Sequence, residues 1–185
     1  MQRTLFRYIL CVVEQSPPQG SPLHDNHCED VAAIQQLAAI PSILEVVCRA
    51  TGMGFAAVAR VTDTRWIACA VRDEIDFGLE QGSELDVRTT ICDEIRGHRE
   101  AIMIENVAED PIYRTHDTPR LYGFQSYISV PILRGDGEFF GTLFAMDFVP
   151  AKLANSSAAT ALGLFAELIG LLLDAARTAG ATPPG

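Results

Sequence analysis

The sequence lacks an excess of positive charge, a paired set of cysteines and a long uninterrupted apolar run. Its 185 residues hold 14 Lys and Arg against 24 Asp and Glu, a net charge of −10. A surface of that charge repels phosphate backbones and anionic lipid, so we expect neither nucleic acid nor a membrane surface as a partner, and the charge favours solubility. No apolar run reaches the ~18 residues that a membrane-spanning helix requires.

The cysteines are few and scattered, which is not the pattern of a disulfide framework. They are Cys11, Cys28, Cys48, Cys69 and Cys92. Such usage is typical of a reducing cytoplasm, which we predict as the location. The N-terminal stretch MQRTLFRYILCVV begins with basic residues, but Arg7 interrupts its apolar part and no small-residue cleavage site follows. We therefore do not expect a signal peptide.

The sequence also lacks a nucleophile elbow, a phosphate-binding glycine loop and a zinc-protease motif. His24, His27 and Cys28 have a spacing that could seat a transition metal on one helical turn. No second pair of ligands follows them, so we predict no metal site. The acidic residues at 73–76 indicate a solvated loop.

The composition predicts one domain with a real core, because 48% of the residues are hydrophobic. Residues 16–22 are rich in Pro, Gly and Ser and read as a linker. We expect an N-terminal extension and linker over residues 1–29, a domain over 30–178 and a flexible tail over 179–185.

Periodicity predicts an α+β fold in which helices flank a mostly antiparallel sheet. Pro41 sits where a second helix could begin, so the first helical segment breaks near Ile40. The expected elements are helices over 30–51, 89–97 and 155–177, and strands over 55–61, 66–71 and 101–105, followed by a hairpin of two strands within 122–147.

Four segments and the order of the elements resemble a GAF domain. The segments are TTICDEI at 89–95, IENVAEDP at 104–111, YGFQSYISVPI at 122–132 and GEFFGTLFAMD at 137–147. The resemblance covers about residues 30–177 and is to the kind found ahead of bacterial sensor histidine kinases. It implies a central sheet of five to six strands, with the terminal helices on one face and short helices and loops over a pocket on the other.

The resemblance also implies ligand classes that can be compared residue by residue. Bilin-binding relatives attach the pigment to a cysteine shortly before the fourth strand, whereas the segment here, YRTHDTPRLYGF, contains His116 and no cysteine. We therefore expect no covalent bilin, and we find no residue set of the cyclic-nucleotide binders; the cofactor is otherwise open. Free methionine sulfoxide reductase uses several cysteines, and Cys92 falls near one of them, but no cysteine follows it to resolve an intermediate.

The implied pocket is rich in aromatic residues, which offer apolar area with polar tips. Its expected lining is Trp66, Cys69, Phe77, Ile91, Cys92, Ile104, Tyr113, His116, Tyr122, Phe124, Tyr127 and Ser129. The alternative is that these residues simply pack the core. Cys92, near a helix start, is a candidate reactive thiol or a small buried hydrophobe. His116 could contact a polar ligand or lie in solvent.

The final helix carries two apolar stripes. One is Leu162, Phe165, Ile169, Leu172 and Ala176, and the other is Leu164, Leu168, Leu171 and Ala175. One stripe can cover the sheet, and the second would be exposed in a monomer, which predicts a homodimer through this helix. The alternative is that both stripes pack within the domain, against the 30–50 helix.

Three hypotheses follow. The first is a non-enzymatic domain that senses a small molecule and relays ligand state through its terminal helices to a histidine kinase or similar output. The second is a redox enzyme that uses Cys92, like the sulfoxide reductases. The third is a degenerate scaffold whose pocket is filled.

Overall fold

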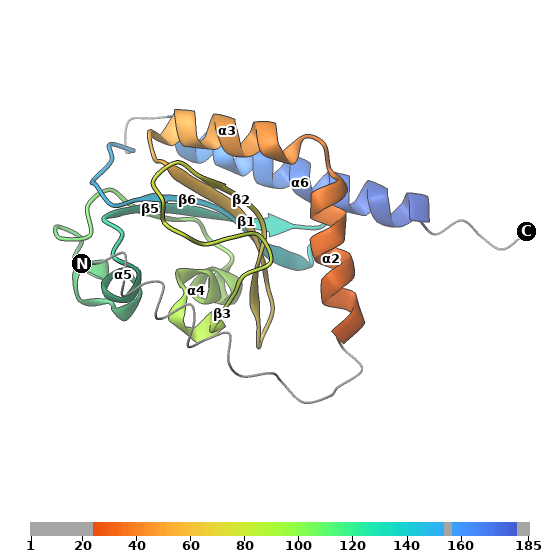
Figure 1. Ribbon diagram of the computed structural model, residues 1–185, viewed down its shortest axis with the longest axis horizontal. Helices are drawn as coiled ribbons and strands as arrows, with labels where there is room; N and C mark the ends of the chain where they lie inside the picture. The colour runs from red at the N-terminus through yellow and green to blue at the C-terminus, as the bar shows by residue number, and fades with distance from the viewer. Residues whose placement is uncertain (1–23, 154–156, 181–185) are drawn as a thin grey trace, which may run out of the picture.

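The computed structural model describes residues 24–153 and 157–180, and in this part six antiparallel strands form one sheet (Figure 1). The strands are β1 (Phe55–Val61), β2 (Trp66–Asp73), β3 (Glu84–Leu85), β4 (Ile102–Ile104), β5 (Ser126–Leu133) and β6 (Phe139–Asp147), in the order β3-β2-β1-β6-β5-β4. The α+β plan expected from the sequence is therefore confirmed.

The central strands are buried on both faces. Every residue of β1 except Arg60 is buried, and so are the seven residues between the two ends of β6. This explains why these segments read as nearly continuous apolar runs rather than as alternating ones. The sheet consequently has two separate apolar layers to fill, one on each side.

The long helices cover one face. They are α2 (His24–Gln36), α3 (Ile40–Thr51) and α6 (Ala158–Gly180), and Figure 1 shows α3 and α6 side by side over the sheet. The expected break is found, since α2 ends at Gln36 and α3 begins at Ile40 with Pro41 in its first turn. The predicted domain limits stay predictions; the proposed start at residue 30 falls within α2, and residues 1–23 and 181–185 lie outside the described part.

The helix α6 packs on β5 through residues that differ in part from the predicted stripe. Leu162 and Ile169 are buried as expected, together with Ala166 and Leu173, whereas Ala176 is exposed. Gly170 allows close approach, because a Cβ there would lie 2.1 Å from the carbonyl oxygen of Leu133. The buried spacing of 162, 166, 169 and 173 follows the 3.6-residue period of the helix.

By length and composition, α6 could cross a membrane over Ala158–Ala179. This segment does not appear as an uninterrupted apolar run in the sequence, because Glu167 and Asp174 divide it. Among the described helices, only Glu29–Gln36 and Ile40–Thr51 taken together, bent by 78°, also pass. A third of the α6 window is buried inside the protein, and core helices of soluble proteins meet the same criterion, so this is weak evidence of a span.

Short helices cover the opposite face: η1 (Val87–Thr89), α4 (Ile91–His98), η2 (Tyr113–Thr115) and α5 (Asp117–Tyr122). Figure 1 shows α4 and α5 on the side of the sheet away from α3 and α6. The terminal helices and the short helices are therefore separated by the thickness of the sheet, as the expected plan required.

An ionic cluster joins the terminal helices to the sheet. Asp30 of α2 binds Arg60 (Nε to Oδ2, 2.7 Å) and Arg134 (Nη2 to Oδ1, 3.0 Å), whose side chains are 13% and 10% exposed. Both guanidinium groups lie over the ring of Phe140, 4.9 and 5.3 Å from its centre. Asp174 of α6 accepts a hydrogen bond from the backbone N–H beside Arg134, at Gly135 (2.6 Å). We call these residues the arginine clamp.

Replacing Asp30 with Ala removes the carboxylate that pairs most closely with two largely buried guanidinium groups, and leaves Arg134 only its longer contacts of 3.8 and 3.9 Å with Asp174 and Glu138. We expect the free energy of unfolding to fall by about 3 kcal/mol, since breaking a buried ion pair leaves a buried charge that is no longer compensated. Denaturant unfolding measures this. The control is Glu45→Ala, which removes a carboxylate whose ion pairs within the described residues are with the exposed Arg49 and the half-exposed Arg72, and which should leave stability near that of the wild type. Equal losses in both variants would contradict the role given to the clamp.

Candidate functional site

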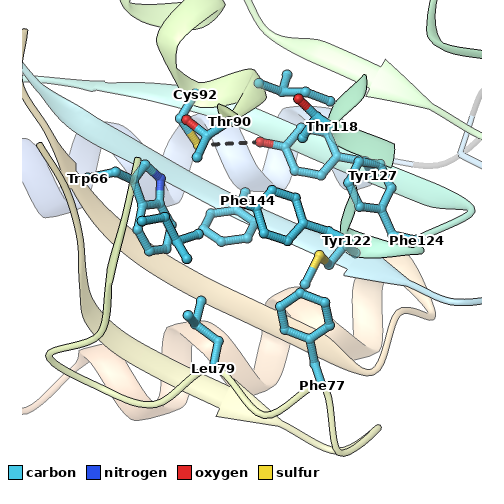
Figure 2. Close-up of a pocket in the computed structure, with 13 residues that line it drawn as sticks. Trp66, Phe77, Leu79, Thr90, Cys92, Thr118, Tyr122, Phe124, Tyr127 and Phe144 are labelled. Carbon is cyan, nitrogen blue, oxygen red and sulfur yellow. Dashed lines mark hydrogen bonds between the residues drawn. The ribbon is translucent and has the colours of Figure 1, made fainter. Parts of the chain in front are cut away.

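A cavity of about 40 Å³ lies between the sheet and the short helices (Figure 2). The strands β2, β5 and β6 form its floor, α4 and α5 form one side, and the segment between β2 and β3 forms another. It is lined by Trp66, Phe77, Leu79, Leu85, Thr90, Ile91, Cys92, Thr118, Tyr122, Phe124, Tyr127, Phe144 and Met146. The presence of this cavity argues against a scaffold whose pocket is filled.

Aromatic rings in mutual contact build much of the wall. Phe144 lies 6.1 Å from Trp66 and 5.9 Å from Tyr127, and Tyr127 stacks on Phe124 at 5.4 Å between centroids. Figure 2 shows Phe144 between Trp66 and the tyrosines, with Phe77 and Leu79 at the side opposite Thr90 and Cys92. Edge-to-face and offset contacts of this kind favour a fixed arrangement of the rings.

Most polar tips at the cavity are bonded within the protein. Thr90 donates to the carbonyl of Val87 at 2.7 Å, and Thr118 donates to the carbonyl of Thr89 at 2.9 Å. The hydroxyls of Tyr122 and Thr89 lie 2.7 Å apart and share a hydrogen bond. These bonds tie η1, α4 and α5 into one cover over the cavity.

Cys92, in the first turn of α4, is buried among hydroxyl groups. Thr142 donates to its sulfur at 3.2 Å, and the Tyr127 hydroxyl lies 3.5 Å from the same atom. Burial raises the pKa of the thiol, although the hydrogen bonds from Thr142 and Tyr127 act in the opposite direction. Desolvation therefore outweighs any benefit of the helix start, and Cys92 is held as a neutral thiol.

The structure brings seven of the twelve predicted pocket residues to the cavity. They are Trp66, Phe77, Ile91, Cys92, Tyr122, Phe124 and Tyr127. Ile104, Tyr113 and Ser129 are buried but do not line it. His116 lies outside, about a third exposed; its Nε2 is 3.2 Å from Glu94, to which Tyr113 also donates at 3.0 Å. These two residues brace the loop against α4 instead of facing the cavity.

Cys69 requires a correction, because it packs under the long helices. Val58 pairs with Ala70 and Ala59 pairs with Ala68, so Cys69 is the extra residue of a β-bulge in β2. The bulge leaves Cys69 and Ala70 in the same layer, away from Trp66. Even in a regular strand, residues 66 and 69 point to opposite faces, so the alternation could have excluded Cys69.

Six lining residues were missed by the sequence prediction: Leu79, Leu85, Thr90, Thr118, Phe144 and Met146. Phe144 and Met146 could have been found, since they are two apart on a strand and must share a face. The others lie on loops or short elements, where spacing does not indicate orientation.

The acidic segment at 73–76 has a structural role, and the side chains of the metal candidates lie outside the described part. The Asp73 carboxylate accepts hydrogen bonds from the backbone N–H groups of Ile75, Phe77 and Gly78, at 2.9–3.1 Å, and so orders the segment that carries Phe77. The side chains of His24, His27 and Cys28 lie outside the described residues. Among those described, no cluster of three His, Cys, Asp or Glu could hold a metal ion.

The sequence profile of the GAF domain family matches residues 35–173. The match covers most of the chain, and the chain therefore belongs to the GAF domain family. No curated protein matches the chain.

Solved structures with this fold include sensors and enzymes. The GAF domain of PixJ from Thermosynechococcus elongatus, in its blue-light-absorbing form, has a TM-score of 0.62 at 11% identity, over 82% of this chain and 89% of that one. The GAF domain of an Acinetobacter phosphoenolpyruvate-protein phosphotransferase has a TM-score of 0.59 at 14% identity, over 98% of each chain. The free methionine-R-sulfoxide reductase of Neisseria meningitidis, bound to its substrate, has a TM-score of 0.58 at 17% identity, over 96% and 91%. At these identities the likeness shows the fold alone.

Burial of the thiols predicts a loss of stability at alkaline pH. Burial raises the pKa of Cys69 to about 12, whereas the unfolded chain releases that proton near pH ~8.5. Above that pH the unfolded state binds fewer protons than the folded state, so the free energy of unfolding falls as pH rises towards the folded pKa. We expect Cys69 to contribute up to about 1.4 kcal/mol per pH unit in this window.

Denaturant unfolding at pH values from neutral to alkaline checks the effect. Cys69→Ala should show a shallower decline than the wild type, because one titrating group is lost. Ile67→Val, a buried neighbour without a titrating group, should lower stability but keep the wild-type slope. The same slope in all three proteins would overturn the prediction.

Proposed function

We propose that this chain is a non-enzymatic signalling sensor domain that binds a small molecule in the cavity and relays its presence through the terminal helices. The observation that carries the proposal is the separation of the cavity from those helices by the sheet. A ligand bound on one face leaves α2, α3 and α6 free to contact an output domain, such as a histidine kinase, or a partner protein. Ligand binding then shifts the balance between arrangements of these helices.

The size of the cavity and the sequence before β5 limit the ligand. The segment at 112–124 has no cysteine for covalent attachment of a bilin. A cavity of about 40 Å³ is also well below the ~150 Å³ that admits one benzene ring. Both features support a small ligand over a pigment.

A redox enzyme is the second candidate, because Cys92 lies at the cavity and reductases share the fold. The chemistry of the site favours it less. Cys92 is 3% exposed and its pKa is raised, which opposes formation of the nucleophilic thiolate. Cys48 and Cys69 lie in the other apolar layer, across the sheet, and cannot reach it.

We expect the purified protein not to reduce free methionine-R-sulfoxide, with dithiothreitol as the reductant and loss of sulfoxide followed by chromatography. Cys92→Ser and Cys48→Ser should behave like the wild type, since neither thiol is then catalytic. Turnover that disappears in Cys92→Ser and persists in Cys48→Ser would establish the enzyme instead and reject the sensor proposal.

The exposed side of α6 supports the proposed homodimer. Leu164, Leu168 and Leu171 are 62%, 41% and 63% exposed, and Ala175 is exposed as well. The alternative, that this stripe packs against the 30–50 helix, is not what the structure shows; α3 packs beside α6 and leaves the stripe uncovered. Val46 of α3 is also 45% exposed, so apolar area on both helices is available to a second copy.

Replacing both Leu164 and Leu171 with Asp should weaken self-association at least about tenfold, because paired charges would face the partner helix. The two positions are exposed, so the fold should be unaffected. The matched control is Ile112→Asp, at a residue 66% exposed and far from α6 in sequence. Sedimentation velocity over a concentration series measures the effect. A wild-type protein that stays monomeric throughout, or equal association in both variants, would refute the dimer.

A further inference from the structure

The lining of the cavity contains no charged side chain. Its thirteen residues include no Asp, Glu, Lys, Arg or His. Transfer of an ion from water into such surroundings costs several kcal/mol unless an opposite charge pairs with it. The lining therefore selects against anions and cations and favours a neutral molecule.

Trp66 presents an unused hydrogen-bond donor at this cavity. The residue is 1% exposed, and its Nε1 is among the buried side-chain atoms of the described residues that have no hydrogen-bond partner. Figure 2 shows this nitrogen on the edge of the indole that faces Cys92. The N–H is one of the smaller influences that oppose the rise in the pKa of the Cys92 thiol caused by burial, but it does not reach hydrogen-bonding geometry with the sulfur.

An unpaired buried donor is costly, by about 1–3 kcal/mol, and a ligand acceptor would recover part of that cost. The hydroxyls of Thr90 and Thr118 already donate to backbone carbonyls, and those of Tyr122 and Tyr127 already have partners. Cys92 and Tyr127 share one contact, so apart from the weak S–H donor there, the N–H of Trp66 is the donor left for a ligand among the described lining residues. A molecule with one acceptor matches this arrangement better than a hydrocarbon does.

The volume sets the size of the molecule. Since one water needs roughly 10–15 Å³ by this measure, a cavity of about 40 Å³ holds about three water-sized groups. We propose that the cavity binds a neutral molecule of about three to four non-hydrogen atoms, whose single acceptor, of the carbonyl type, pairs with the indole N–H of Trp66. The inference rests on the proposed sensor function and specifies the ligand class of the same site.

Three probes of nearly the same shape separate the effect of the acceptor on binding from the effect of charge. Acetone has a carbonyl acceptor, isobutene replaces that oxygen with a CH₂ group, and acetate adds a negative charge. Trp66 is the only tryptophan of the chain, so its indole N–H gives a single resonance in a ¹H–¹⁵N spectrum. Ligands of four heavy atoms bind weakly, so titrations should run into the millimolar range and beyond.

Acetone should shift the indole resonance saturably and bind about fivefold more tightly than isobutene, while acetate should not bind. In Trp66→Phe, followed through the methyl resonances of Leu79 and Ile91, the affinity for acetone should fall about fivefold and that for isobutene should change less than twofold. A merely structural role of the ring would move both affinities together.

The results that would contradict the ligand class differ from those that would contradict the sensing role. Equal binding of acetone and isobutene, insensitive to Trp66→Phe, would overturn the ligand class and leave a ligand-binding sensor intact. Tighter binding of acetate would overturn the requirement for neutrality alone. No binding of any probe, with unchanged resonances of the lining methyl groups, would overturn both this inference and the sensing role of the cavity.

Discussion

The structure depends on burial of the central sheet on both faces. Strands β1, β5 and β6 are apolar on both sides, so two covers are needed, and one chain supplies them in different ways. The long helices α3 and α6 pack with apolar stripes on their layer. The other cover is built from short helices that are too brief for such stripes and are joined by hydroxyl–carbonyl bonds at Thr90 and Thr118. A cavity is therefore expected on the side of the short helices, where packing is interrupted most often.

Two β-bulges determine which side chains reach each layer. In β2, Cys69 is the extra residue, and in β6, Phe140 is the extra residue opposite the pair Ile132 and Leu133. The second bulge turns Phe140 towards the long helices while Thr142 and Phe144 serve the cavity side. Gly141 between them is required, since a Cβ there would lie 1.9 Å from the carbonyl oxygen of Ala59. The bulge in β6 thus places a residue of the arginine clamp and a partner of Cys92 two positions apart but on opposite faces of one strand.

The limits of the sequence prediction follow from the same features. The sheet, the break at Pro41 and the helix-covered face were predictable because strong periodicity and proline geometry indicate them directly. The layer of Cys69 was predictable too, since alternation from Trp66 already puts it on the opposite face, whereas the bulge that leaves Ala70 in the same layer was not. His116 and Tyr113 do not line the cavity because they belong to the short η2 segment and its end, where spacing does not indicate orientation, and Glu94, which contacts them both, is 19 or more residues away in the sequence. The unused donor of Trp66 could not be predicted at all, since it depends on where every neighbouring acceptor is already bonded.

A short series of contacts connects the cavity with the terminal helices. Cys92 of α4 accepts a hydrogen bond from Thr142, and two residues away the ring of Phe140 lies under Arg60 and Arg134. These arginines bind Asp30 of α2, and the turn after Arg134 binds Asp174 of α6. A ligand that pairs with the Trp66 N–H acts beside Cys92, at the first step of this series. Because the clamp combines charges with little access to water, a shift of Phe140 would alter interactions on both terminal helices. The clamp therefore lies where the relay that we propose between the cavity and the terminal helices would pass.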